Sequence, residues 1–291
     1  MRTAATVPAH SSFQQRGDVA TKWPVLQAAA EMAHASPGPS MAPSVWAPAP
    51  MQDAPVRDGA QSIIRTLKES DTGAITRASV CFGRSMRTDP TMTYVTGGRC
   101  PERVGALFEQ VAAMCMRGAR DPATIWLLET PRSGGDSDSA DVVCIASEYP
   151  AAYPSDWELL RAGLLRVLLA CPGWGVVRAL MSLMSQFSTP KAHFNKEHGD
   201  FLYIWCFGTA PEQQGRGLGS QLMRRVLQHA DAKYLPVYLE ASGAASAAFY
   251  RRHGFLDIKQ VRASPGAPEL YIMARPRASQ LQQQAQQQGQ Q

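Results

Sequence analysis

A glycine-rich hexapeptide, Gln214–Gly219 (QGRGLG), has the residue types and spacing of an anion-binding loop. Its three glycines stand at alternate positions and let a ligand approach the backbone closely. A helix is predicted to begin at Arg216, and the unpaired N–H groups and the dipole of a helix's first turn favour an anion. The spacing therefore predicts a phosphate-binding loop.

Two common phosphate motifs do not fit this hexapeptide. No Lys-Ser or Lys-Thr pair follows its last glycine, as a P-loop would require. A dinucleotide fingerprint that starts at Gly215 would need glycine or alanine at position 220, where the chain has Ser220. A dehydrogenase would also carry that fingerprint at the start of repeated strand–helix units, whereas the hexapeptide lies late in the chain.

The flanking segments are the elements that must position this loop. Phe201–Gly208, before it, is a continuous apolar and aromatic run, which is typical of a strand buried on both faces. After it, Leu218, Leu222, Val226 and Ala230 recur four residues apart, which predicts an amphipathic helix. The loop thus joins a buried strand to a helix.

Two motifs carry a family resemblance. Gln214, Gly217 and Gly219 read as Q-x-x-G-x-G, and Tyr250 with Gly254-Phe255 reads as Y-x-x-x-G-F about thirty residues later. With a strand before the first motif and a helix after it, the chain resembles the GNAT superfamily, which transfers an acetyl group from acetyl-CoA to an amine. The resemblance implies an α/β (α+β) GNAT fold, with a mixed central sheet flanked by helices.

The resemblance also implies that acetyl-CoA is the co-substrate. In the family, the central strand and the strand after the loop helix splay apart, and the pantetheine arm inserts between them. The contacting positions would be Phe207, Gly208 and Thr209, and the phosphate-binding positions Gln214, Gly215, Arg216, Gly217, Leu218, Gly219 and Ser220. A buried strand end, followed by a glycine turn that lets the helix pack on its strand, would explain the same residues without a ligand.

Tyr250 is the implied general acid, which would protonate or hydrogen-bond to the departing thiolate. Its helix is expected to present Ala245, Ala248 and Phe249 to the core, with small residues beside Tyr250 that leave room for a narrow ligand. The alternative is a tyrosine packed at the edge of the domain with its hydroxyl in water.

The general base and the acceptor pocket have weaker signals. Glu240, at the end of the strand after the loop helix, is the candidate base, although it could equally be an ion-paired strand end. Asp200 and His198, at the start of the central strand, are alternatives. An acceptor pocket or an ordinary helix core face would both explain a further set of residues: Trp174, Met181, Met184 and Phe187.

The predicted function is N-acetyltransferase, with a primary amine of a small molecule as acceptor. The L-E-A-S segment and the F-Y-R-R-H-G-F ending resemble members of the family thought to act on small amines. A protein N-terminus or a lysine side chain is the alternative acceptor. A non-catalytic acyl-CoA-binding module would keep the loop but lack a usable base, and binding of NAD instead of CoA would revive a dehydrogenase.

Composition excludes several other classes. A formal net charge of +5 is too small to predict a nucleic-acid partner. The six cysteines show no metal-ligand or paired spacing, so neither a zinc site nor a disulfide framework is expected, and reduced thiols indicate an intracellular, cytoplasmic protein. The longest apolar helix candidate, Trp157–Ala170, contains Arg161 and Arg166, so no membrane span is expected.

The chain divides into three parts by composition. Residues 1–60, with eight prolines and fourteen alanines, are predicted to be disordered. Residues 1–17 contain Arg2 and Arg16 but no acid, which is compatible with a transit peptide to a plastid or another organelle. Residues 61–274 form the expected GNAT domain, and residues 275–291 are a glutamine-rich tail predicted to be disordered.

The pattern within the domain predicts seven strands, at Ser62–Lys68, Thr124–Glu129, Val142–Ser147, Phe201–Gly208, Val237–Glu240, Phe255–Val261 and Leu270–Ala274. Helices are expected over residues 72–86, from Pro101, over Trp157–Ala170, over Gly175–Phe187, from Arg216 and over Ala244–His253. Ser133–Asp138 is expected to be a hairpin loop, and Ser188–Asp200 a polar loop that leads into the central strand.

Overall fold

The structure is a computed structural model that describes residues 62–68, 71–98, 101–131, 140–171, 173–262, 264 and 266–278. The predictions for residues 1–60, for Ser133–Asp138 and for most of the glutamine-rich tail lie outside these residues. The chain divides into two compact units, Met1–Pro39 and Ser40–Gln291, and all described residues belong to the second.

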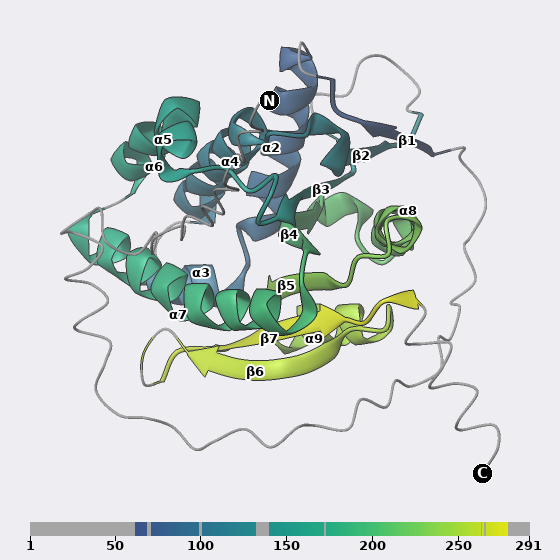
Figure 1. Cartoon of the computed structure of the whole chain (residues 1–291). Helices are drawn as coiled ribbons and strands as arrows, with labels where there is room; N and C mark the ends of the chain where they lie inside the picture. The colour runs from purple at the N-terminus through teal and green to yellow at the C-terminus, as the bar shows by residue number, and fades with distance from the viewer. Residues whose placement is uncertain are drawn as a thin grey trace, which may run out of the picture. The chain divides into compact units, whose positions relative to one another are not determined.

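Within the described residues, seven strands form one mixed sheet in the order β1-β2-β3-β4-β5-β7-β6 (Figure 1). Their bounds are β1 Ile63–Thr66, β2 Ile125–Glu129, β3 Val142–Tyr149, β4 Phe201–Thr209, β5 Val237–Ala241, β6 Leu256–Arg262 and β7 Glu269–Arg275. β4 and β5 pair in parallel, and the other neighbouring strands are antiparallel. The predicted mixed sheet is confirmed, with every strand within two residues of its expected bounds.

The helices of the described residues flank this sheet. They are α2 Thr72–Met86, α3 Pro90–Val95, α4 Pro101–Gly118, α5 Asp156–Leu159, α6 Leu165–Ala170, α7 Trp174–His198, α8 Leu218–Ala232 and α9 Ala244–Arg251. Single turns also occur at η2 Pro122–Thr124, η3 Leu160–Leu164 and η4 Pro211–Gln213. The helices predicted over residues 72–86, from Pro101, from Arg216 and from Ala244 are therefore confirmed.

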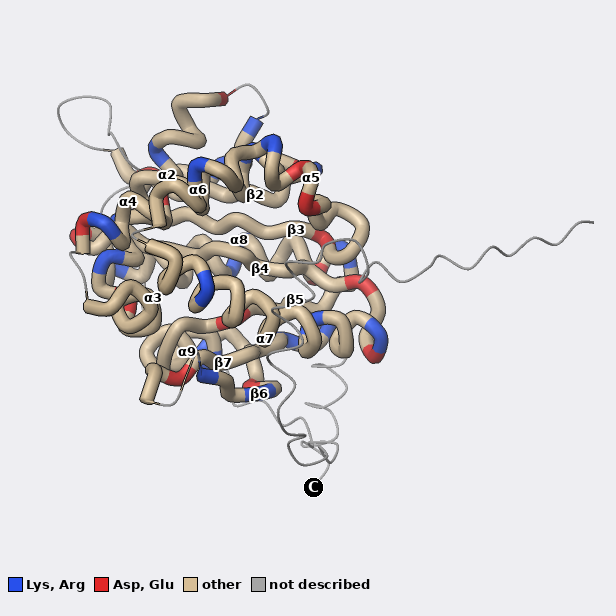
Figure 2. Tube along the Cα trace, turned by 90° about the vertical axis from the view of Figure 1, so that its left-hand side faces the viewer, with Lys and Arg blue, Asp and Glu red and all other residues tan. Residues whose placement is uncertain are grey.

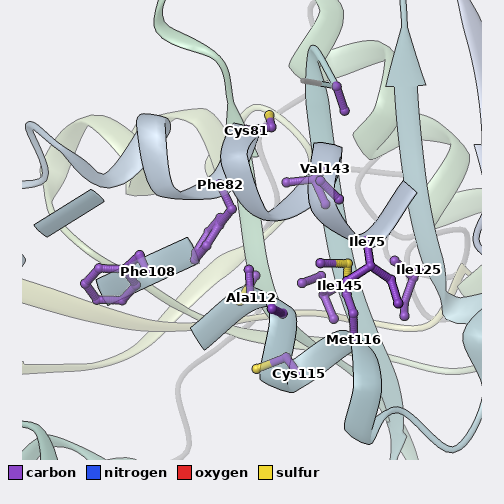
Figure 3. Close-up of a cluster of buried hydrophobic side chains, with 14 of the residues drawn as sticks. Ile75, Cys81, Phe82, Phe108, Ala112, Cys115, Met116, Ile125, Val143 and Ile145 are labelled. Atoms are coloured by element: carbon purple, nitrogen blue, oxygen red, sulfur yellow. The ribbon is translucent and has the colours of Figure 1, made fainter. Parts of the chain in front are cut away.

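The two faces of the sheet are both covered, because successive strand residues point to opposite sides. On β2, Ile125 and Leu127 pack with α2 and α4, whereas Trp126 and Leu128 pack with α8. Figure 3 shows the first of these clusters, in which Ile75 of α2 lies beside the strand side chains Ile125 and Ile145. The buried strands read as continuous apolar runs for this reason.

α7 covers the β4–β5–β7 part of the face that α2 and α4 cover elsewhere. It is longer than predicted: the helix expected over Gly175–Phe187 continues to His198, so the polar loop expected over Ser188–Asp200 is wrong. Pro190 lies inside it and removes one helix N–H donor. The helix continues past this proline because buried side chains recur at helical spacing on both sides: Leu183, Phe187, Lys191 and Phe194.

Two other segments differ from expectation. Asp89 and Pro90, which follow the end of α2, begin the unexpected helix α3, because the Asp89 carboxylate accepts a hydrogen bond of 2.8 Å from the Met92 N–H. The helix expected over Trp157–Ala170 is divided into α5, η3 and α6, and Gly163 inside it has a φ of 127°.

Charged residues lie mainly outside the central strands. In Figure 2 the traces of β3 and β4 are mostly tan, and the charged residues gather on the surrounding helices and turns. None of the described helices has the length and hydropathy needed to cross a membrane.

Candidate active site

A pocket of about 760 Å³ lies where the end of β4, the start of α8, the β5–α9 turn and α9 meet. All ten residues predicted to bind the cofactor, Phe207–Thr209 and Gln214–Ser220, line it. Tyr250 lines it as well, whereas Glu240 does not. The structure therefore brings both sequence motifs to one pocket and places the candidate base elsewhere.

The start of α8 forms one wall of this pocket. Gly217 is the N-cap residue of α8, with a left-handed φ of 82°, which favours glycine. A Cβ atom built there would have no neighbour within 4 Å, so the space next to the backbone is open. The N–H groups of Leu218, Gly219 and Ser220 have no partner inside their own helix and are available to an anion. The structure therefore places a helix start with open space beside its backbone in the pocket wall.

Three arginines add positive charge around this helix start. Arg216, Arg224 and Arg252 line the pocket, and Arg224 and Arg252 have no acidic partner within the part of the chain that the structure describes. His253 lies 3.2 Å from the Ser220 hydroxyl, and burial, aided by Arg224 and Arg252, lowers the pKa of its imidazole to about 4. Arginines without carboxylate partners beside a helix N-terminus suit a phosphate-bearing ligand.

Gly208 has a packing reason of its own. A Cβ atom at this position would lie 2.3 Å from the Ser85 hydroxyl oxygen and 3.0 Å from a Phe82 ring carbon, so α2 approaches β4 too closely for any side chain. Gly219 is also tight, since its Cβ would lie 3.1 Å from the Thr209 hydroxyl oxygen. Close packing therefore explains the need for glycine at positions 208 and 219, and both residues also line the pocket.

β4 and β5 separate at the pocket. Their ladder pairs Leu202 with Val237 and ends at Ile204 with Leu239, although β4 continues to Thr209. On the other edge of β4 the pairing with β3 is irregular at Trp205, which is skipped between the partners of Ile145 and Ala146. The strand end is thus free on its β5 side, as the splayed strands of the resemblance imply.

Tyr250 is more buried than predicted. The core stripe expected at Ala245, Ala248 and Phe249 is wrong, because the buried residues of α9 are Ala247 and Tyr250. The helix is rotated relative to the expectation, and Tyr250 packs into the cluster between α8, α9 and the sheet.

The surroundings of the Tyr250 ring are aromatic. Its centroid lies 6.3 Å from that of Phe207, 5.2 Å from Phe249 and 5.5 Å from Phe255. Burial raises the pKa of its hydroxyl well above the usual value, so the group stays protonated. A protonated hydroxyl at the pocket wall is able to donate a hydrogen bond.

Glu240 lies on the α7 side of the sheet. The Tyr203 hydroxyl donates a hydrogen bond of 2.8 Å to its Oε2, and its Oε1 is buried without a partner among the described residues. Burial raises the pKa of this carboxyl, opposed by the charge of Lys191 and by the Tyr203 hydrogen bond. No charged nitrogen of the described residues lies within 4.0 Å of the Glu240 carboxylate, so Glu240 does not form the ion pair considered as the alternative.

Similarity to known proteins identifies the domain that contains this pocket. Residues 176–255, which contain α7 from its third residue, β4, the glycine loop, α8, β5 and α9, match the model of the acetyltransferase (GNAT) family. The chain carries a GNAT acetyltransferase domain.

Two curated relatives contain related sequence. An uncharacterized N-acetyltransferase of Schizosaccharomyces pombe is 29% identical over 109 residues, which are 37% of this chain and 44% of that protein. A GCN5-like protein acetyltransferase of Mycobacterium tuberculosis is 28% identical over 162 residues, which are 52% of this chain and 78% of that protein. The match thus spans less than half the length of the yeast relative.

Solved structures share the fold of the GNAT domain. Arylalkylamine N-acetyltransferase 2 from Aedes aegypti has a TM-score of 0.51 at 14% identity, over 74% of this chain and 99% of that one. A putative arylalkylamine N-acetyltransferase 7 from the yellow fever mosquito has a TM-score of 0.50 at 15% identity, over 73% and 86%. The predicted GNAT fold is confirmed.

The other sequence candidates lie away from the pocket of the GNAT domain. Asp200 is exposed beside the first residue of β4, and His198 lies just before it, so the length of β4 separates both from Thr209. The candidate acceptor residues do not line the pocket either: Trp174 and Met184 are exposed, and Phe187 belongs to the core under α7.

Sequence reasoning missed several polar groups of the GNAT domain. Arg224 and Arg252 have no motif, although both lie within one helical turn or two of a motif residue. Lys191 was assigned to a loop, and its signal was the spacing of four from Phe187 that places a lysine on an apolar helix face.

Proposed function

We propose that this chain is an acetyl-CoA-dependent N-acetyltransferase whose acceptor is a primary amine of a small molecule. The observation that carries this proposal is the pocket itself, in which the left-handed Gly217 at the start of α8 and the free end of β4 share one wall. A helix start for a pyrophosphate and a strand edge for a peptide-like arm match the two halves of CoA.

The residues that hold the co-substrate follow from that arrangement. Gln214–Ser220 bind the pyrophosphate, with Arg224 and Arg252 beside it, and Phe207–Thr209 bind the pantetheine arm. The open space over Gly217 fits such a ligand, because a Cβ atom would occupy it. When bound, acetyl-CoA supplies an activated acetyl thioester.

The catalytic groups flank the gap between the strands. Glu240 takes the proton from the attacking amine, since a carboxyl with a raised pKa is a better base than an exposed one. Tyr250 donates its hydroxyl proton, or a hydrogen bond, to the sulfur as the carbon–sulfur bond breaks. The new bond joins the amine nitrogen to the acetyl carbon, and the products are an amide and the CoA thiol.

A protein acceptor is the second candidate, because the mycobacterial relative is named as a protein acetyltransferase. An assay of thiol release from acetyl-CoA, with mass spectrometry of the acceptor, separates the candidates. Small primary amines should accelerate thiol release and gain one acetyl group. Acetylation of peptides alone would favour the protein acceptor, and CoA binding without release in either panel would indicate a non-catalytic module.

A further inference from the structure

Lys191 is a buried lysine in the middle of α7. Its residue is only 8% exposed, and its side-chain nitrogen lies 3.7 Å from the ring centroid of Tyr203 and 5.2 Å from that of Tyr153. Buried lysines in proteins are nearly always paired with a carboxylate. In the described residues, however, Lys191 has no hydrogen bond and no ion pair within 4.0 Å. Its ammonium group is held by ring faces.

A carboxylate contacts the hydroxyl of the same tyrosine. The Tyr203 hydroxyl donates to Glu240 Oε2, so this one side chain touches both the lysine nitrogen, at its ring, and the glutamate, at its hydroxyl. Trp205 completes the group, with its ring centroid 4.7 Å from that of Tyr153 and 6.0 Å from that of Tyr203. We call Tyr153, Tyr203, Trp205 and Glu240 the lysine cage.

The lysine cage and its neighbour Tyr238 hold polar atoms without partners. Within the part of the chain that the structure describes, Glu240 Oε1, Trp205 Nε1 and the Tyr238 hydroxyl are buried and make no hydrogen bond. Each such group destabilises a fold unless a ligand or water satisfies it. Two of the three are acceptors that an ammonium group satisfies, and the indole N–H is a donor.

The lysine cage lies where β4 and β5 separate. Glu240 follows Leu239, the last residue of the β4–β5 ladder, and Trp205 follows Ile204, its partner in that last pair. The opposite face of the sheet at the same separation is covered by α8 and α9, and the pocket is lined by their residues together with Ser85 and Met86 of α2. The lysine cage and the pocket therefore lie at the same strand separation.

We propose that the lysine cage binds the acceptor's amine, that it is selective for an unbranched primary alkylammonium group, and that Lys191 occupies it in the absence of acceptor. This inference rests on the proposed function and adds the substrate class. The resident side chain is itself a butylammonium group, so its fit to the lysine cage shows which ligand shape the site accepts. Ring faces recognise such a cation, and Glu240 supplies the carboxylate.

The absence of hydrogen bonds to Lys191 makes this occupancy reversible. An acceptor that gains the hydrogen bonds left open at Glu240 displaces the lysine side chain toward solvent, since lysine stems are long and flexible. Burial also lowers the pKa of Lys191, which weakens its hold on the ring faces by favouring the neutral amine.

Removal of the lysine side chain tests this inference without CoA. Lys191→Ala frees the space of all but one carbon of a butylammonium group and keeps a good helix former. In thermal-shift and calorimetric titrations with n-butylammonium chloride, this variant should bind at least about tenfold more tightly than the wild type, because the competing cation is gone. Lys196→Ala, an exposed lysine of the same helix, is the matched control and should behave as the wild type.

Two comparisons show whether charge matters. n-Butanol should bind the Lys191→Ala variant much more weakly than n-butylammonium, and the double variant with Glu240→Gln should lose most of the gain. Equal binding of alcohol and amine would mean an apolar cavity and would overturn the proposal, as would equal amine affinity in Lys191→Ala and the wild type.

A second variant covers a failure of Lys191→Ala to fold. Lys191→Val keeps an apolar side chain on this helix face but is shorter than lysine and leaves most of the lysine cage open, and it should lower the KM for n-butylamine in the acetyl-transfer assay by about tenfold. An unchanged or higher KM would overturn the proposal. Amine binding without any acetyl transfer would overturn the proposed function but support amine binding by the lysine cage. Acetyl transfer without tighter amine binding in the variants would support the proposed function and overturn the role of the lysine cage.

Discussion

Glu240 and Tyr250 lie on opposite faces of the sheet at the point where β4 and β5 separate. Glu240 bonds to Tyr203 under α7, and Tyr250 packs against Phe207 under α8 and α9. The proposed proton acceptor and the proposed proton donor therefore lie on either side of this strand separation. This arrangement suits a reaction in which the nucleophile loses a proton and the leaving group gains one.

Tyr250→Phe removes only a hydroxyl that makes no hydrogen bond within the described residues. The fold and the affinity for CoA should be nearly unchanged, and kcat should fall by about tenfold or more, since a positioned acid contributes roughly 10²–10⁴-fold. The KM for acetyl-CoA should move little, as for an interaction made in the transition state. Steady-state kinetics check this, and loss of CoA binding would make Tyr250 a wall of the pocket instead of an acid.

Tyr203→Phe should shift the pH dependence of kcat/KM. The Tyr203 hydrogen bond favours the ionised form of Glu240, so its removal raises the carboxyl pKa further. The base is active when ionised, and the acidic limb of the profile should therefore move to higher pH. The charge of Lys191 lowers the pKa of the Glu240 carboxyl in both proteins. The neighbouring Tyr153 and Tyr238 are uncharged at these pH values, because burial raises the pKa of each hydroxyl.

The profile is measured for the wild type and Tyr203→Phe with the same amine, because the amine's own ionisation then cancels. Glu240→Gln should lose the acidic limb that the two share. An identical limb in all three proteins would assign the base to another group.

Gly208→Ala should destabilise the domain by about 1–3 kcal/mol, because overpacking forces neighbours to move. The cause is the 2.3 Å approach of the new Cβ to the Ser85 hydroxyl oxygen, so Ser85→Gly should recover part of the loss in the double variant. Gly175→Ala in α7 is the opposite case. It meets nothing within 4 Å and should stabilise the helix by about 1 kcal/mol. Urea denaturation measures the free energy of unfolding of each variant. A change of the same sign in Gly208→Ala and Gly175→Ala would contradict this account.

His253 should make the folded domain less stable in acid. The pKa of its imidazole is about 4 in the folded state, below the usual 6.5, so the unfolded chain binds the proton first. The domain has its full stability with respect to this group above pH 6.5 and loses stability as the pH falls to about 4. His253→Gln should lose less stability between pH 7 and 4 than the wild type, as measured by thermal unfolding. An equal loss would place the acid sensitivity elsewhere.

The sequence predicted the part of the site that local motifs determine. The glycine loop, its flanking strand and helix, and the position of Tyr250 near the loop follow from spacing and period alone, and the structure brings them to one pocket. The rotation of α9 was not predictable in the same way, because Ala247 and Ala248 are equally apolar and only tertiary packing decides which of them is buried.

The lysine cage shows why the rest escaped prediction. Pro190 and the polar residues around it favour a loop by local propensity. The segment is helical instead because Phe187 and Phe194 pack on the sheet, and local propensity carries no information about that packing. The residues of the lysine cage come from three separate segments and Lys191 from a fourth, and their proximity depends on the strand order β4-β5-β7 and on the path of α7.

Gly217 provides the most direct test of CoA binding at the start of α8. Asparagine tolerates the left-handed backbone of this residue and has the same shape as aspartate, so Gly217→Asn measures the effect of a side chain and Gly217→Asp adds only its charge. Isothermal titration with CoA should give a weaker Kd for Gly217→Asn than for the wild type. For Gly217→Asp the Kd should be weaker by about a further tenfold, since a carboxylate repels a bound pyrophosphate. Equal affinities in the two variants would place the phosphates elsewhere and contradict the account.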